Sequence, residues 1–186
     1  MGHHDINEHH AGVSLAAPLI GAPAPEFKGT AYFKDYDGEG FKEISLDDYK
    51  GKWVILVFFP AAFTGVCASE VKAFSEEIAS FAGEGAELVG ISGDSQFALK
   101  AWAQSGEVGE VKFPLLSDLN HYAGAAYQVY NCPAGLNYRG LFIVNPGGVV
   151  MHAVLHHFAI GRNTSETLRV LQALKSGGVC MANWKK

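Results

Sequence analysis

The sequence predicts a single α/β domain built around a buried central sheet, and three observations lead to that fold class. An unbroken apolar run at 53–59 is typical of a strand buried on both faces. It is followed by apolar residues at helical spacing and then by a second short apolar run at 88–91, which together predict a strand–helix–strand unit with parallel strands. With 186 residues and 48% hydrophobic content, the chain is long enough for one full core.

The first half of the chain begins with a predicted hairpin. Short strands at 31–33 and 41–44 flank the turn-rich stretch 35–40. The central strand at 53–59 then ends at Pro60, because proline cannot continue a strand ladder. The helix that follows carries an apolar stripe at steps of four and three residues, formed by Cys67, Val71, Phe74, Ile78 and Phe81.

The middle of the chain continues the alternation of strands and helices. After the strand at 88–91, a helix is predicted to begin at 94–96. A short strand and turn follow at 113–118, and another helix lies near 122–127. The candidate packing residues of the helix that begins at 94–96 are Phe97, Leu99 and Trp102.

A second hairpin and a long helix complete the predicted fold. Strands at 141–144 and 149–155 are joined by Asn145-Pro146-Gly147-Gly148, a strong turn sequence. Asn163, with a glutamate three residues later, has the pattern of a helix capping box. The helix is expected to end at 177–178, where two glycines follow its apolar residues Leu168, Leu171 and Leu174.

Composition argues against several classes of function. The net charge of −5 and the absence of a dense Lys/Arg cluster argue against nucleic-acid binding. No stretch approaches the length of a membrane span, and no basic segment precedes a hydrophobic one at the N-terminus, so we expect a cytoplasmic protein. The histidine-rich leader at 1–18 is expected to be flexible and is assigned no function.

Three cysteines, Cys67, Cys132 and Cys180, are spaced too widely for a metal site built from cysteine pairs or for a paired-cysteine reductase. We therefore expect no metal site of this kind. Cys67 falls in the first turn of its helix, where unpaired N–H groups and the helix dipole favour a thiolate. The hydroxyl of Thr64, one turn earlier, is expected to approach the sulfur. Position alone is also compatible with a buried, purely structural cysteine.

The string from Pro60 to Glu70, which begins with Pro-x-x-x-Thr-x-x-Cys, closely resembles the active-site motif of the peroxiredoxins. These are thiol peroxidases with a thioredoxin-like fold. The resemblance implies that Cys67 is the nucleophile, that Pro60 shields it, and that Thr64 contacts thiolate and peroxide. Further segments match the family in the same order along the chain, at 19–27, 45–52, 139–146, 161–162 and 179–184.

The later matches are those of the typical two-cysteine branch, which includes alkyl hydroperoxide reductase C and the thioredoxin peroxidases. The resemblance implies that Arg139 is the active-site arginine and that Glu70 orients it. Arg162 matches a second arginine of the branch, but this match is less specific than that of Arg139. Cys180 matches the resolving cysteine, which comes from the partner subunit, and Trp184 four residues later belongs to the same match.

The resemblance implies a peroxidase that reduces hydrogen peroxide and organic hydroperoxides through a Cys67 sulfenic acid and an intersubunit disulfide to Cys180. It also implies that a thioredoxin-like or flavoprotein-linked dithiol protein reduces the disulfide, that no bound cofactor or metal is required, and that the enzyme is a homodimer that assembles into a ring of dimers, a decamer. The implied fold is thioredoxin-like, with an N-terminal hairpin extension in the domain at 19–176 and a resolving-cysteine tail at 177–186. The alternatives are a one-cysteine peroxidase and a chaperone-like ring whose assembly is redox-regulated.

The sequence also departs from the family motif. The family usually has aspartate at Ala62, an aromatic residue at Gly65, and Pro-Thr at 68–69. None of these differences removes a reacting group, although glycine at position 65 is expected to loosen the start of the helix. Cys132 matches no catalytic position and is interpreted as structural or incidental.

Overall fold

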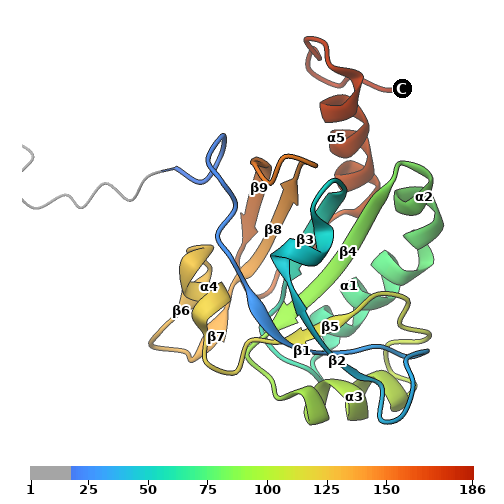
Figure 1. Cartoon of the computed structure of the whole chain (residues 1–186), viewed down its shortest axis with the longest axis vertical. Coiled ribbons are helices and arrows are strands. Elements are labelled where there is room, and N and C mark those ends of the chain that lie inside the picture. Colours follow the sequence, from blue (N-terminus) through green and yellow to red (C-terminus); the bar gives the residue numbers. More distant parts are fainter. Residues whose placement is uncertain (1–17) are drawn as a thin grey trace, which may run out of the picture.

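The computed structural model describes residues 18–186, so all but the last residue of the predicted leader lies outside the described residues. The described chain alternates strands and helices around one sheet (Figure 1). Its strands are β1 (Lys28–Tyr32), β2 (Phe41–Ser45), β3 (Trp53–Phe58), β4 (Ala86–Ser92), β5 (Leu115–Ser117), β6 (Tyr130–Asn131), β7 (Leu136–Asn137), β8 (Arg139–Val144) and β9 (Val150–His156). Its helices are the 3-10 helix η1 (Leu46–Tyr49) and the α-helices α1 (Gly65–Glu76), α2 (Ile78–Gly83), α3 (Gln96–Gln104), α4 (Tyr122–Ala126) and α5 (Thr164–Ser176).

Within residues 18–186, seven strands form the main sheet, in the order β2-β1-β5-β4-β3-β8-β9. Strands β3, β4 and β5 run parallel, and β8 lies antiparallel to β3 on its other side. Both predicted hairpins are confirmed, because β1 pairs with β2 and β8 pairs with β9, each antiparallel. This order places β3, and the loop that follows it, near the middle of the sheet.

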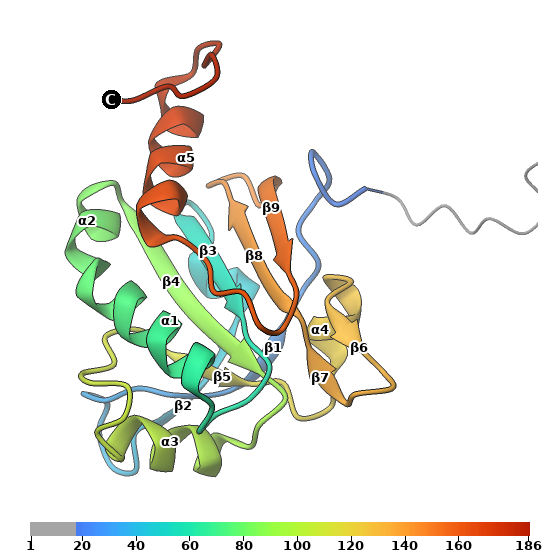
Figure 2. The ribbon, with the colours of Figure 1, turned by 180° about the vertical axis from the view of Figure 1, so that it is seen from behind.

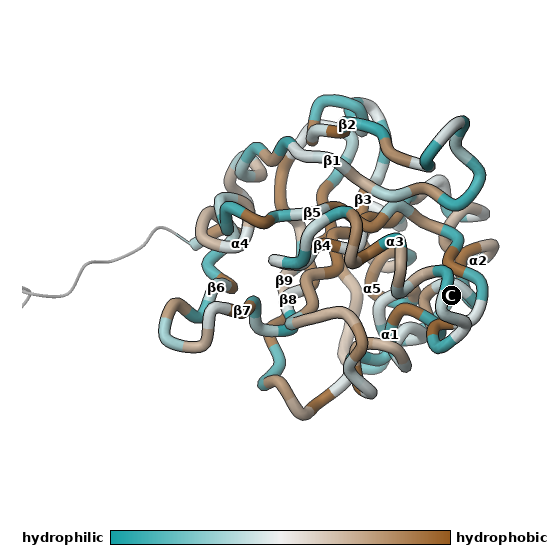
Figure 3. Tube along the Cα trace, turned by 90° about the horizontal axis from the view of Figure 1, so that it is seen from below, coloured by the Kyte–Doolittle hydropathy of each residue, from teal (hydrophilic) through white to brown (hydrophobic). Residues whose placement is uncertain are grey.

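Each face of the sheet carries its own buried hydrophobic cluster, as the alternating side chains of β3 illustrate. Ile55 and Val57 face the cluster made with α1, α2, α3 and α5. Leu56 and Phe58 face the opposite cluster, which η1 and α4 cover. The prediction of a strand buried on both faces is therefore confirmed. Figure 2 shows α1, α2 and α5 on one side of the strands, and Figure 3 shows hydrophobic residues along β3 and β4 inside a more hydrophilic periphery.

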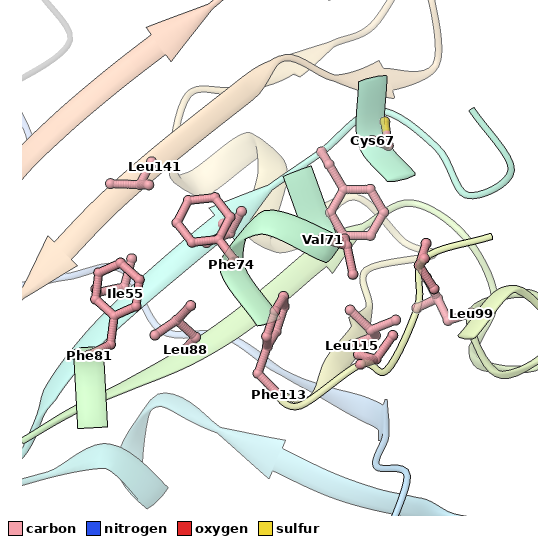
Figure 4. Close-up of a cluster of buried hydrophobic side chains, with 14 of the residues drawn as sticks. Ile55, Cys67, Val71, Phe74, Phe81, Leu88, Leu99, Phe113, Leu115 and Leu141 are labelled. Carbon is pink, nitrogen blue, oxygen red and sulfur yellow. The ribbon is translucent and has the colours of Figure 1, made fainter. Parts of the chain in front are cut away.

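Two details of the predicted helices needed correction. The apolar stripe that begins at Cys67 is confirmed as buried except at Ile78, which is only partly buried, but Glu77 divides the helix into α1 and α2. Figure 4 shows the stripe packed against the strands. Phe97, expected to pack in the core, is instead 62% exposed, and its ring makes a T-shaped contact with the ring of Phe41.

The final helix confirms its predicted ends. The Asn163 side chain accepts a hydrogen bond from the backbone N–H of Glu166 at the N-terminus. Gly177 follows α5 in the left-handed conformation, φ 71°, which glycine adopts without a steric cost. The small hairpin of β6 and β7 was not predicted. In the part of the chain that the structure describes, no helix combines the length and apolar character required to cross a membrane.

Candidate active site

Cys67 lies where the central strand gives way to a helix. It is the third residue of α1, just beyond the carboxyl end of β3, the edge at which open α/β sheets bind their ligands. Its side chain has no exposed surface. Figure 4 shows its sulfur at the start of the buried stripe, above Val71 and Phe74. Cys67 therefore faces the protein rather than the solvent, as its place in the apolar stripe of the helix implies.

The loop between β3 and α1 has a tightly specified backbone. The pairing of β3 with β4 extends one residue beyond β3, since the Phe59 N–H donates to the carbonyl of Ile91 at 3.0 Å. Pro60, which is buried, then has no N–H to continue it. The next buried amide, that of Ala62, donates instead to the Asp94 carboxylate at 2.8 Å.

The loop turns into the helix through two residues of contrasting conformation. Phe63 has φ 56°, in the left-handed region that bulky residues rarely adopt, and its ring packs on Trp102 with 6.4 Å between the ring centroids. Thr64 is extended at the N-cap position of α1. Its hydroxyl donates to the carbonyl of Ala61 at 2.9 Å.

The sulfur of Cys67 is contacted by a buried arginine. Because β8 runs antiparallel to β3, its first residue, Arg139, lies beside the end of β3 and the start of α1. The Nη1 atom of Arg139 is 3.3 Å from the Cys67 sulfur. Its Nε donates to the carbonyl of Phe158 at 2.8 Å, which fixes the plane of the guanidinium.

Glu70 ties this arginine to a second one. Its Oε2 accepts from Arg139 Nη1 at 2.7 Å and from Arg162 Nη2 at 2.9 Å. Its Oε1 accepts from the backbone N–H and the Nε of Arg162, both at 2.7 Å. Arg162 also donates to the carbonyl of Gly140. All three charged side chains are almost completely buried. Arg162, the weaker match in sequence, is therefore an integral part of the cluster.

The electrostatics of the cluster favour an ionised Glu70. Burial alone raises the pKa of this carboxyl, but its hydrogen bonds and charge interaction with Arg162, together with the charge of Arg139, outweigh burial and hold the pKa below its ordinary value. One carboxylate thus faces two guanidiniums, which leaves net positive charge next to the sulfur. The arrangement is suited to stabilising negative charge on sulfur or on an oxygen bonded to it.

Comparison with known proteins agrees with this geometry. A model of the AhpC/TSA family matches residues 20–153. A putative peroxiredoxin in the rubredoxin operon of Clostridium pasteurianum is 41% identical over 170 residues, which cover 89% of this chain and 94% of the relative. Peroxiredoxin TSA1-B of Candida albicans is 42% identical over 176 residues, covering 90% of this chain and 88% of the relative. The chain is a peroxiredoxin of the AhpC/TSA family.

The fold of this peroxiredoxin matches solved structures of the family. The reduced 2-Cys peroxiredoxin of Plasmodium vivax superposes with a TM-score of 0.86 at 34% identity, over 91% of this chain and 90% of the other. AhpC of Enterococcus faecalis gives a TM-score of 0.82 at 32% identity, over 89% of this chain and 100% of the other. The predicted family, the thioredoxin-like α/β fold and the assignment as a thiol-dependent peroxidase are confirmed.

The other two cysteines of the peroxiredoxin, Cys132 and Cys180, lie away from the cluster of Cys67, Glu70 and the two arginines. Arg162 binds Glu70 just before α5 begins, and α5 then runs for 13 residues, about 20 Å, before the chain reaches Cys180. Figure 2 shows the tail at the C-terminal end of α5, far from the first turn of α1. Cys180 is partly buried, with its sulfur 3.4 Å from the Ser176 hydroxyl. Cys132 is exposed in the turn between β6 and β7.

Besides the contact of Cys180 with Ser176, polar contacts of Trp184 and Lys186 hold the tail of the peroxiredoxin against its own chain. Arg169 on α5 donates to the carbonyl of Trp184 at 3.1 Å. Glu84, which follows α2, accepts from Lys175 at 2.8 Å and from Lys186 in the tail at 2.6 Å. These two lysines, with Gln172, lower the pKa of Glu84 to about 2.

Sequence reasoning about this peroxiredoxin missed one residue of the site. Asp94, which binds the amide of Ala62, was treated only as the start of a helix. Its position could have indicated a role in the site, because Asp94 lies two residues beyond the carboxyl end of β4, a strand parallel to β3. Among residues 18–186, no group of three or more histidine, cysteine or acidic side chains is placed to hold a metal ion.

Proposed function

We propose that Cys67 is the thiol with which this peroxiredoxin attacks peroxides. The observation that carries the proposal is the 3.3 Å contact between Arg139 Nη1 and the Cys67 sulfur, inside a buried cluster at the first turn of α1. A guanidinium stays charged at any physiological pH and offers several donors in a fixed plane. Beside a helix N-terminus, it favours the thiolate that the reaction requires.

The first step is an attack of the Cys67 thiolate on one oxygen of the peroxide. An S–O bond forms and the O–O bond breaks, so the sulfur becomes a sulfenic acid and the other oxygen leaves as an alcohol or water after taking up a proton. Arg139 donates to the oxygen on which negative charge develops. Thr64, at the N-cap, orients the peroxide, and the buried Pro60 keeps water from the sulfur.

Glu70 and Arg162 act through Arg139 rather than on the peroxide. Glu70 accepts from Arg139 at 2.7 Å and so fixes the direction of its Nη1 toward the sulfur. Arg162 occupies the other lone pairs of the carboxylate and keeps it ionised. The two residues are positioning residues for the arginine that contacts the reacting atoms.

We propose that Cys180 of another subunit resolves the sulfenic acid, with formation of an S–S bond and loss of water. Support comes from the length of α5, which keeps Cys180 of the same chain far from Cys67. A two-fold dimer supplies two equivalent cysteine pairs, and we propose a homodimer that assembles further into a ring of dimers, a decamer.

The disulfide is then reduced by a thioredoxin-like or flavoprotein-linked dithiol protein through thiol–disulfide exchange. A relative from Drosophila melanogaster, 39% identical over 183 residues, is named a mitochondrial thioredoxin-dependent peroxide reductase, which supports the thioredoxin-like alternative. The catalytic unit is assigned to residues 19–176 and the resolving tail to 177–186. We propose that the reaction takes place in the cytoplasm.

Three cysteine variants test the proposal in steady-state peroxide turnover with a thioredoxin system. Cys67→Ser should abolish turnover, because a hydroxyl is not ionised at neutral pH and is a far weaker nucleophile. Cys180→Ser should lose turnover with the dithiol protein but retain one round of Cys67 oxidation. Cys132→Ser is the matched control and should stay within a few-fold of wild type. Full turnover in Cys180→Ser would favour the one-cysteine alternative.

A further inference from the structure

We propose that Asp94 is a positioning residue for the peroxide step, and that its carboxylate holds the loop at 59–64 in the shape that places Cys67 against Arg139. Asp94 does not touch the sulfur. It acts through the backbone of the loop, and the inference rests on the proposed role of Cys67. None of the sequence motifs discussed above assigns Asp94 to the reaction.

The carboxylate of Asp94 is itself firmly placed. Ser92, the last residue of β4, donates its hydroxyl to Oδ2 at 2.8 Å, and the Asp94 carbonyl accepts from the Ser117 hydroxyl at 2.7 Å. These bonds tie Asp94 to the ends of β4 and β5, two strands of the central sheet. The same Oδ2 accepts the N–H of Ala62 at 2.8 Å, so the loop is anchored to the neighbouring strand ends by a single carboxylate oxygen.

The Ala62 amide depends on this anchor. The β3–β4 ladder ends with Phe59, Pro60 has no N–H, and Ala62 is 8% exposed. A buried amide without an acceptor is strongly unfavourable, so the loop keeps this conformation only while the acceptor is present. The next residue, Phe63, has φ 56°, a conformation that is costly for an aromatic residue and must be held by its surroundings.

The loop conformation has opposite consequences for the two chemical steps. The closed loop starts α1 at Gly65 and seats Cys67 beside Arg139, which the attack on peroxide requires. In this state the sulfur has no exposed surface, so the loop or the first turn of α1 must open before Cys180 can reach it. Asp94 should therefore accelerate Cys67 oxidation and slow disulfide formation.

The test compares Asp94→Ala with Asp94→Asn in the full chain. Quenched-flow alkylation and mass spectrometry give two rates: the loss of the Cys67 thiol to hydrogen peroxide, and the appearance of the Cys67–Cys180 disulfide. We expect Asp94→Ala to slow the first roughly ten- to a hundred-fold, as a small displacement of a reacting group does, and to speed the second. Asp94→Asn should remain within a few-fold of wild type, because its amide oxygen can accept both hydrogen bonds.

Two further variants complete the test. Asp118→Ala is the matched control: Asp118 also follows a strand, but its carboxylate accepts the backbone amides of Ala123 and Gly124 instead of an amide of the loop. Because the substitution removes only the side chain and keeps the backbone bond from Asp118 to Ser92, Asp118→Ala should lower the melting temperature and leave the two rates close to wild type. Ser92→Ala keeps the Asp94 carboxylate but removes the hydroxyl that donates to it. It should change both rates in the same directions as Asp94→Ala, but by less. It replaces Asp94→Ala in the test if that variant does not fold.

An Asp94→Ala variant with a wild-type rate of Cys67 oxidation would overturn the inference. So would equal slowing of both rates with a lowered melting temperature, which would mean that Asp94 is only structural. Should Asp94→Ala not fold, wild-type rates in Ser92→Ala would overturn it as well. If peroxide does not consume the Cys67 thiol of the wild-type enzyme at all, the proposed function fails and this inference fails with it.

Discussion

Replacing Glu70 with glutamine should remove the negative charge that both arginines of the site bind, while keeping the shape of the side chain. Glu70 is 3% exposed and accepts every one of its side-chain hydrogen bonds from Arg162 or Arg139. Glutamine offers one oxygen in place of two and carries no charge, so two buried guanidiniums lose their counter-charge. Removing one partner of a buried ion pair costs about 3–5 kcal/mol of folding free energy.

This cost should be visible in thermal unfolding. For a chain of this size, 1 kcal/mol shifts the midpoint by about 2–4 °C, so Glu70→Gln should lower it by roughly 6–20 °C. The matched control is Glu43→Gln, which removes the exposed pair with Lys28 and should leave the midpoint nearly unchanged. The second-order rate of Cys67 oxidation should fall as well, because Arg139 loses the carboxylate that directs its Nη1 to the sulfur.

The loss of stability in Glu70→Gln should also depend on pH, in a direction that the pKa of Glu70 sets. The pKa of Glu70 in the folded protein lies below its ordinary value of 4.5. The stabilisation is therefore complete above that value and is lost as the pH falls through the lowered pKa. The stability difference between wild type and Glu70→Gln should be full at neutral pH and should narrow in acid. A midpoint within a degree or two of wild type at neutral pH, with unchanged oxidation kinetics, would refute the role assigned to Glu70.

Three further predictions follow from the site and the tail. Arg139→Ala should slow Cys67 oxidation by roughly a hundred-fold or more, as loss of a donor to a developing oxyanion does; stopped-flow rates near wild type would exclude its catalytic role. Glu84→Gln should weaken the hold of Lys186 on the tail and speed formation of the Cys67–Cys180 disulfide, and an unchanged rate would show that these contacts do not restrain the tail. Sedimentation should find dimers or larger rings at micromolar concentration, and an active monomer would contradict resolution by a partner subunit.

The sequence predicted the central elements because their patterns are local. The apolar run of β3 and the stripe at Cys67 identify a buried strand and a helix that packs on it. Periodicity did not show the division of that helix at Glu77 or the exposure of Phe97, since a regular stripe does not reveal where a helix bends or which apolar residue it leaves outside. Strands β6 and β7 have only two residues each, too few for any pattern.

The site was predictable only in part, because only some of its residues lie close together in the sequence. Pro60, Thr64 and Cys67 lie within one short segment, so their spacing is visible in the sequence. Arg139 is 72 residues from the cysteine it contacts, and Arg162 is 92 residues from Glu70, so both came from resemblance to a family rather than from spacing. The carboxylate of Asp94 reaches the loop only because β4 lies beside β3, a relation that the fold creates.

The most direct test of the account is peptide mapping of the wild-type enzyme after reaction with one equivalent of hydrogen peroxide, with free thiols blocked and the digest kept non-reduced. The account predicts a disulfide between Cys67 and Cys180, with the two peptides joined across subunits in a covalent dimer and with Cys132 recovered as a free thiol. Recovery of Cys67 as a free thiol, or a disulfide that contains Cys132 in place of Cys67, would contradict it.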